Sequence, residues 1–309
     1  MFSVKVDAVG NGDKKNSRCI WENLPRDAIA LIAKRLDKYD MRTLRMVSKH
    51  WFTSVNSELR EVCISRWTVQ QMGSFTNVMR SIAAHFPHLR SLRARGLHDA
   101  DIAVIAVHLP TVQSLDLGMM KIGIEGVNHL MSLPKLEILF LSGTEVGDVA
   151  MQTLCKLTGL TNLDLWSTRV TDVGMQGIPA LKNLTSLELG GTAVSDKGLS
   201  YVAELPELKK LMLSWTSVTD AGVLHLTKLT RLTCLDLIGT ELADPGVRHL
   251  AKLRGLVSLN LCWTKVGLSG MVHMAGLTNL TSLNVKWTKS RLKELDCFHD
   301  LPHLSELLA

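Results

Sequence analysis

Residues 208–231 read LKKLMLSWTSVTDAGVLHLTKLTR, and units of the same length and pattern lie on either side of them. Residues 160–183 and 184–207 differ from this unit mainly at positions between the leucines. The second leucine of each L-x-x-L-x-L motif recurs every 24 residues, at Leu115, Leu139, Leu163, Leu187, Leu211, Leu235, Leu259, Leu283 and Leu307. A fixed period of this size predicts stacked structural repeats.

The motif resembles the leucine-rich repeat, with Thr where Asn or Cys usually stands. In that architecture L-x-L forms a short strand with inward leucines, and stacked units form a parallel sheet. We therefore expect an α/β solenoid with a concave parallel sheet and convex helices.

Two polar columns follow each predicted strand. The first holds buried hydroxyls that we expect to satisfy backbone groups where the chain leaves the sheet; it comprises Thr144, Thr168, Thr192, Thr216, Thr240, Thr264 and Thr288. The second holds Asp148, Asp172, Asp196, Asp220 and Asp244, and in most units Gly follows two residues later. An Asp before an apolar helical pattern predicts an N-cap for the helix of its own repeat.

The repeats extend toward both ends of the chain in less regular form. Regular units run from about residue 112, and residues 280–309 turn polar after LTSLNVKWT, which predicts a terminal capping unit. Leu59-x-x-Val62-x-Ile64 reads as an irregular first repeat, and Leu89-x-x-Leu92 opens a second after a predicted helix near 75–85. The predicted solenoid spans residues 59–309. Residues 1–19 are predicted to be a disordered tail.

Residues 20–58 do not follow the repeat and predict short amphipathic helices. They contain Leu24-Pro25-x-Asp27, and then, in order, Ile29, Ile32, Leu36, Asp40-Met41, Leu44, Val47-Ser48-Lys49 and Trp51. This series resembles the F-box, an all-α adaptor-binding segment, although Ala28 stands where that family usually has Leu. An F-box followed by leucine-rich repeats is a familiar domain order among substrate receptors of Skp/cullin/F-box ubiquitin ligases.

The resemblance implies a Skp-type adaptor and, through it, a cullin ligase as partners. The implied adaptor-binding residues are Leu24, Pro25, Asp27, Ile29, Ile32, Leu36, Leu44, Val47 and Trp51. An alternative is that Ile32, Leu44, Val47 and Trp51 form only the core of a helical cap. About 40 residues bury too little surface to fold alone, so surplus apolar side chains must meet the first repeat or another chain.

Composition and charge argue against several other classes of protein. Hydrophobic residues make up 46% and charged residues 21% of the chain, so disorder throughout is not expected. No stretch has the length and apolar character of a membrane span, and the dispersed cysteines suggest reduced thiols, so we expect a cytoplasmic or nuclear protein. Residues 1–90 hold 15 Lys and Arg against 8 Asp and Glu, and these charges are spread over predicted helical turns, which favours an acidic protein partner over nucleic acid.

Catalytic, cofactor and metal sites are not predicted. The nucleotide-binding, hydrolase and zinc-protease motifs are absent from the sequence, and the many Asp residues follow from repetition. His129, His225, His249 and His273 share one column, but no carboxylate or cysteine recurs with them. We expect a protein that is not an enzyme and binds no cofactor.

The concave face offers a candidate target site. Residues between the two leucines of L-x-L should point outward, and they include Asp164, Glu188 and Asp236. Trp215, Trp263 and Trp287 share a column near the strand ends, with Trp166 one position earlier. Solvated acids, and rings that pack on adjacent repeats, are the structural alternatives to a binding role. Acids flanked by aromatic rings favour an unknown, basic target protein.

The sequence therefore favours the substrate-recognition subunit of an F-box ubiquitin ligase. One alternative is a stand-alone repeat scaffold or inhibitor with a helical cap. Another is a bacterial effector that mimics a host F-box protein. A receptor for a small-molecule signal ranks lower, because the short repeats offer no long loop to enclose a ligand.

Overall fold

The computed structural model describes residues 61–64, 74–86, 88–289 and 301–308. The larger of its two compact units comprises residues 61–83 and 89–309. The predicted tail, residues 1–19, and the predicted adaptor-binding segment, residues 20–58, lie outside the described residues, as do all nine implied adaptor contacts.

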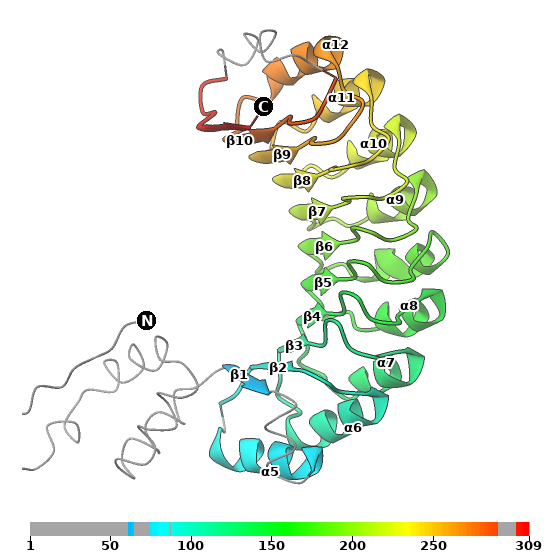
Figure 1. Cartoon of the computed structure of the whole chain (residues 1–309), viewed down its shortest axis with the longest axis vertical. Helices are drawn as coiled ribbons and strands as arrows, with labels where there is room; N and C mark the ends of the chain where they lie inside the picture. Colours follow the sequence, from blue (N-terminus) through cyan, green and yellow to red (C-terminus); the bar gives the residue numbers. More distant parts are fainter. Residues whose placement is uncertain (1–60, 65–73, 87, 290–300, 309) are drawn as a thin grey trace, which may run out of the picture. The chain divides into compact units, whose positions relative to one another are not determined.

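One parallel sheet of 11 strands runs through the larger unit in strict sequence order. Figure 1 shows the short strands stacked one on the next. In the regular repeats each strand centres on the first leucine of L-x-L, and stacking aligns these leucines: Leu211 pairs in register with Leu187 and Leu235. The strands are β1 (Glu61–Ile64), β2 (Ser91–Ala94), β3 (Ser114–Asp116), β4 (Ile138–Phe140), β5 (Asn162–Asp164), β6 (Ser186–Glu188), β7 (Lys210–Met212), β8 (Cys234–Asp236), β9 (Ser258–Asn260), β10 (Ser282–Asn284) and β11 (Glu306–Leu308).

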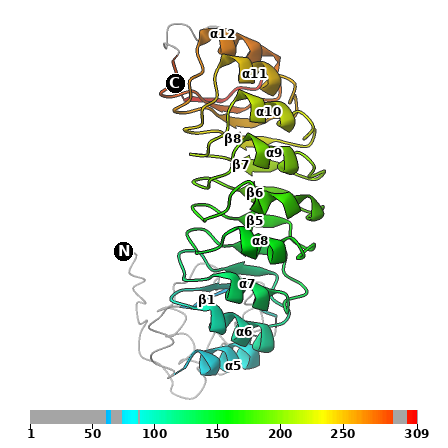
Figure 2. The ribbon, with the colours of Figure 1, turned by 90° about the vertical axis from the view of Figure 1, so that its right-hand side faces the viewer.

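The helices line the opposite, convex side of the repeats, as Figure 2 also shows. The first is the predicted helix over residues 75–85. The helices are α5 (Phe75–His85), α6 (Asp99–His108), α7 (Ile124–Leu130), α8 (Asp148–Leu154), α9 (Asp196–Val202), α10 (Asp220–Leu226), α11 (Asp244–Leu250) and α12 (Leu268–Met271), with 3-10 helices η2 (Gly174–Ala180) and η3 (Val272–Gly276). Pro179 lies inside η2, where it supplies no N–H for α-helical bonding.

The core lies between the sheet and the helices. Leu211, Leu213 and Val218 of one repeat are fully buried, and every regular repeat repeats this pattern. The Thr column has its predicted structural role from Thr144 to Thr264. These six hydroxyls are buried, and each donates to the carbonyl oxygen three residues earlier, as Thr216 does to Leu213 at 2.7 Å.

The Asp column corrects one prediction. Asp172 does not cap a helix of its own repeat; its carboxylate accepts hydrogen bonds from the backbone N–H groups of Ser195 at 2.8 Å and Gly198 at 2.9 Å, at the start of α9 in the next repeat. Asp148 binds Thr171 and Gly174 in the same way. Each Asp therefore satisfies N–H groups that a neighbouring helix leaves open.

The same contact explains why Gly stands two residues after the Asp in most repeats. A Cβ at Gly198 would lie 2.6 Å from Oδ1 of Asp172, which is too close for a side chain. The exception supports the explanation: α8 has Ala150 in place of Gly, and the preceding repeat has Ile124 in place of Asp. Because position 124 carries no carboxylate, position 150 in the next repeat tolerates a methyl group.

Candidate functional site on the concave face

The residues that directly follow the central leucine of each strand form one continuous row on the concave face. Pairing in register joins Asp164 to Glu188, Glu188 to Met212, and Met212 to Asp236. The flanking leucines are buried while these residues stay half-buried, so the predicted outward direction is confirmed. From β2 to β11 the row contains Arg93, Asp116, Phe140, Asp164, Glu188, Met212, Asp236, Asn260, Asn284 and Leu308.

The polar members of this row share a structural task that sequence analysis missed. Each Asp, Glu or Asn of the row accepts a hydrogen bond from the backbone N–H two residues later, where the chain turns out of the sheet. Asp164 binds the N–H of Trp166 at 2.8 Å, and Glu188 binds that of Gly190 at 2.7 Å. The same bond recurs at Asp116, Asp236, Asn260 and Asn284. The recurrence of Asp or Asn just before a turn was the available signal.

Asp116 and Asp236 use their remaining acceptor capacity within the protein. Arg93 Nε lies 2.7 Å from Oδ2 of Asp116. Asp236 accepts additional hydrogen bonds from the hydroxyl of Ser214 at 2.8 Å and the side-chain amide of Asn260 at 3.1 Å. Both carboxylates therefore have a structural reason for their position.

Asp164 and Glu188 differ from these two carboxylates. Within the part of the chain that the structure describes, neither forms an ion pair, as Asp116 does, and neither accepts a side-chain hydrogen bond, as Asp236 does. Burial raises the pKa of Glu188 to about 7, and the neighbouring carboxylates of Asp164 and Asp236 add to the rise. Burial also raises the pKa of Asp164. A cation brought by a partner would relieve this repulsion.

A second row follows the strand ends, where the backbone adopts positive φ in successive repeats. Gly occupies this position at Gly143, Gly191 and Gly239, whereas Trp215, Trp263 and Trp287 hold it with φ of 58°, 59° and 58°. Gly96, Met119 and Ser167 also belong to the row. A non-glycine residue in this region costs about 1 kcal/mol or more. Three large aromatic residues thus occupy the conformation that glycine adopts with least strain.

The rings lie against the next repeat and remain exposed. A Cβ added to Gly239 would collide with the ring of Trp215, and one added to Gly190 would lie 2.6 Å from Cδ1 of Trp166. Trp263 and Trp287 stack with ring centroids 5.4 Å apart. Exposed fractions are 40% for Trp166, 58% for Trp215, 55% for Trp263 and 70% for Trp287. The packing alternative is therefore correct, and it leaves ring surface accessible to a partner.

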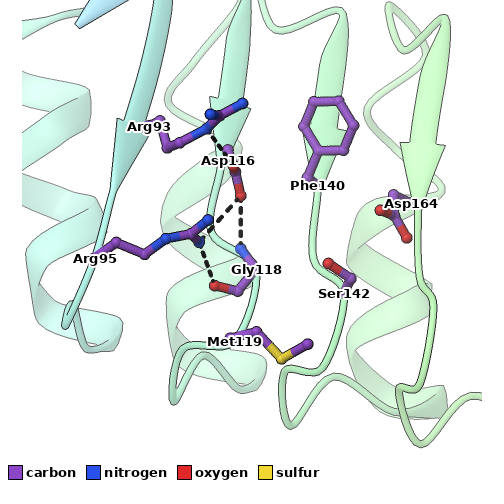
Figure 3. Close-up of a pocket in the computed structure, with 8 residues that line it drawn as sticks. All are labelled: Arg93, Arg95, Asp116, Gly118, Met119, Phe140, Ser142 and Asp164. Carbon is purple, nitrogen blue, oxygen red and sulfur yellow. Dashed lines mark hydrogen bonds and ion pairs between the residues drawn. The ribbon is translucent and has the colours of Figure 1, made fainter. Parts of the chain in front are cut away.

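A pocket of about 330 Å³ lies over β2 to β5 at the N-terminal part of the described sheet (Figure 3). Arg93 and Arg95 stand on its β2 side, Asp164 stands on its β5 side, and Phe140 lies between them. Asp116, Gly118, Met119 and Ser142 complete the lining. Sequence analysis missed both arginines because it treated Leu89-x-x-Leu92 only as the opening of an irregular repeat, although Arg93 follows Leu92 at the outward position of the strand.

No metal centre was found among the described residues, where no three His, Cys, Asp or Glu side chains converge. The column of His129, His225, His249 and His273 lies on the convex helices α7, α10 and α11 and on η3. Arg248 Nε donates to Nε2 of His273 at 3.0 Å, which assigns that histidine a protein partner. Of the described helices, none is long and apolar enough to cross a membrane.

Two family models match the chain. The F-box domain model matches residues 21–62, and a leucine-rich repeat model matches residues 180–203. Together they confirm the resemblance to F-box and leucine-rich-repeat proteins. A comparison with curated proteins finds no match.

Solved structures of internalins share the fold of the repeat region. An internalin (inlF) from Listeria monocytogenes is 21% identical with a TM-score of 0.61, over 84% of this chain and 70% of that one. Internalin C2 (inlC2) from the same organism is 21% identical with a TM-score of 0.55, over 75% of this chain and 91% of that one. At this identity the likeness supports the leucine-rich-repeat fold alone.

Proposed function

We propose that this chain, with its F-box match and leucine-rich repeats, is the substrate-recognition subunit of a Skp/cullin/F-box ubiquitin ligase. The match to the F-box domain over residues 21–62 is the observation that carries the proposal. The concave face supports it, because accessible acids and rings are available for a protein target. The subunit would catalyse nothing and would act in the cytoplasm or nucleus.

The mechanism is proximity. The F-box segment holds the adaptor and the concave sheet holds a target, which raises the effective concentration of target lysines near the charged conjugating enzyme. The proposed adaptor surface is apolar, because Leu24, Pro25, Ile29 and Val47 stand at F-box spacing.

The proposed target surface lies between Asp164 and Trp287. Asp164 and Glu188 offer carboxylates that pair with no cation among the described residues, and Trp215, Trp263 and Trp287 offer exposed ring surface. Coulomb attraction would steer a basic target, and ring faces suit cation–π contact. Asp236 stays within this surface, although hydrogen bonds from Ser214, Ile238 and Asn260 already hold it.

Adaptor binding is tested by replacing Leu24 and Pro25 with Ala in the full-length chain. We expect a loss of adaptor affinity of at least about 30-fold, since interface anchors commonly contribute about 2 kcal/mol or more. Replacement of Lys14 and Lys15 with Ala in the N-terminal tail is the control and should leave affinity unchanged. Calorimetry with purified Skp adaptor that shows wild-type affinity for the Leu24/Pro25 variant would contradict the proposal.

The concave surface is tested with the proteins that wild type captures, identified by crosslinking and mass spectrometry. Asp164→Asn with Glu188→Gln should weaken target binding and reduce its salt dependence, whereas Trp215→Ala or Trp263→Ala should mainly speed dissociation. Neither set should change adaptor capture. If the chain captures targets but no Skp adaptor, the stand-alone repeat scaffold becomes the better description.

A further inference from the structure

The concave face changes the sign of its charge between β2 and β6. On the β2 side, Arg93 and Arg95 share one carboxylate, that of Asp116, at 2.7 Å and 3.6 Å. Two guanidinium groups against one carboxylate leave a net positive charge. On the β5 and β6 side, Asp164 and Glu188 form no ion pair with any described residue.

The two arginines keep donors available for a partner. Arg93 uses Nε on Asp116, and one terminal nitrogen of Arg95 donates to the carbonyl oxygen of Gly118 at 2.8 Å. Each guanidinium has five N–H donors in total. The side chains are 49% and 48% exposed, so their remaining donors face solvent at the pocket.

An apolar surface separates the two charged regions. Phe140 stands in the row between Asp116 and Asp164 and is 37% exposed. Met119 lies at the strand-end side of the same pocket, with its thioether over Gly143 (Figure 3). The pocket therefore presents cations, then apolar surface, then a carboxylate.

The spacing between strands gives the distance between the arginines on β2 and the carboxylate on β5. The three steps from β2 to β5 span about 14 Å at ~4.8 Å per step, which four residues of extended chain also span at ~3.3 Å per residue. Lys210 of β7 limits the acidic region, because it is exposed, pairs in register with Ser186 of β6 and lies beyond Glu188. Basic residues of a partner therefore fit β5 and β6 better than β7.

We propose that the concave face binds one extended target segment in which a single Asp or Glu lies three to five positions from a Lys/Arg pair, with an apolar side chain between them. The acid contacts Arg93 and Arg95, the apolar residue contacts Phe140 and Met119, and the basic pair contacts Asp164 and Glu188. This inference rests on the proposed function, because it specifies the target of the same surface. A carboxylate matches the arginine pair better than a dianionic phosphate, since Asp116 leaves one net positive charge.

The test is selection of a random 12-residue peptide library, displayed on phage, against the immobilised full-length chain. We expect enriched peptides to carry an acidic residue three to five positions from paired basic residues. A synthetic peptide of the enriched consensus should lose roughly tenfold in affinity when its acidic and basic residues are interleaved at constant composition.

Matched variants separate the two ends of the site. Arg93→Gln with Arg95→Gln should abolish selection for the acid and keep selection for the basic pair, and Asp164→Asn with Glu188→Gln should do the reverse. Lys197→Glu on the convex helix α9 is the charge control and should retain both preferences. Circular dichroism melting verifies that every variant is folded.

The inference is overturned if no peptide is enriched, if enriched peptides carry charges of one sign, or if both double variants select the same peptides as wild type. Skp adaptor capture is measured on the same preparations. If wild type does not capture the Skp adaptor, the proposed ligase role is contradicted. The charge order of the target is decided by the peptide results alone.

Discussion

Two rows of carboxylates run along the repeats with the same 24-residue period. The convex row, Asp148 to Asp244, lies at the helix starts, and the concave row includes Asp164 and Glu188. Asp172 of the convex row accepts two backbone N–H groups and the hydroxyl of Ser195, all from the next repeat. Glu188 of the concave row accepts one backbone N–H from its own turn.

The different partners produce opposite electrostatic outcomes. At the end of the convex row, hydrogen bonds from Ser269, Gly267 and Gly270 lower the pKa of Asp244, although desolvation opposes them. On the concave sheet, burial raises the pKa of Glu188 to about 7. The comparison teaches that a repeated acid stabilises the solenoid where the next repeat supplies donors, and stays available to a partner where it does not.

The largest effect on stability is expected when a carboxylate is introduced at a buried position that belongs to neither row. Leu211 is fully buried behind β7, so Leu211→Asp should cost about 4 kcal/mol or more and unfold the repeats cooperatively. Leu211→Met, which keeps apolar volume, is the control and should cost less than about 1.5 kcal/mol. An unchanged melting temperature for Leu211→Asp would mean that the strand register is wrong.

Loss of a convex carboxylate should have the next largest effect. Asp172→Ala removes the acceptor for Ser195 and Gly198 at the start of α9 and should lower the free energy of unfolding by about 2 to 4 kcal/mol. Glu125→Ala is the control because Glu125 is also acidic, in the first turn of α7, and exposed. Equal urea midpoints for Asp172→Ala and Glu125→Ala would contradict the distinction between carboxylates that accept hydrogen bonds from the next repeat and carboxylates that do not.

Loss of a concave charge should stabilise the protein, and only at higher pH. Because the folded-state pKa of Glu188 is raised from 4.5 to about 7, wild type loses stability as pH rises through this window. Burial of the Glu188 carboxyl group is the largest cause of the raised pKa, the hydrogen bond from Gly190 opposes it, and the carboxylates of Asp164 on β5 and Asp236 on β8 add to it. Lys210 is exposed on the neighbouring strand β7.

Glu188→Gln should therefore raise the free energy of unfolding by about 1 to 2 kcal/mol at pH 8, after allowance for solvent screening, and by almost nothing at pH 4. The measurement is urea denaturation at both pH values. Glu204→Gln, on the exposed convex side, is the control. Stabilisation at pH 4 equal to that at pH 8 would refute an electrostatic origin.

The smallest effect concerns the gap in the convex row. Ile124→Asp alone should crowd the methyl group of Ala150, whereas Ile124→Asp with Ala150→Gly should restore the Asp and Gly arrangement seen at Asp172 and Gly198. We expect a favourable coupling of about 1 kcal/mol in a double-mutant cycle by urea denaturation. Additive effects of the two substitutions would show that the joint occurrence of Ile124 and Ala150 has another cause.

Much of the fold was predictable because its determinants are periodic. The 24-residue spacing of the leucines predicted the strands, their inward side and the parallel sheet, and the polar columns predicted the buried Thr hydroxyls. The predicted helix near residues 75–85 is confirmed as α5. The outward acids and tryptophans of the candidate site followed from the same register, since L-x-L alternates between the two faces.

The partners of those residues could not be predicted, because they lie in other repeats. Asp172 was interpreted as a cap for its own helix, whereas its donors are 23 and 26 residues away. Arg93 and Arg95 reach the pocket only because β2 pairs with β3 beside Asp116. The ring of Trp215 lies over Gly239, a contact that requires stacked turns with positive φ.

By itself, the sequence determined the repeat, its strands, its buried columns and the F-box resemblance, since each is a local pattern or a constant spacing. Tertiary structure alone decided which carboxylates are occupied and which are available. The reason is physical: the donors that hold Asp172 come from the next repeat, whereas among the described residues Glu188 accepts only the N–H of Gly190 from its own turn. This difference depends on stacking, and no single unit contains it.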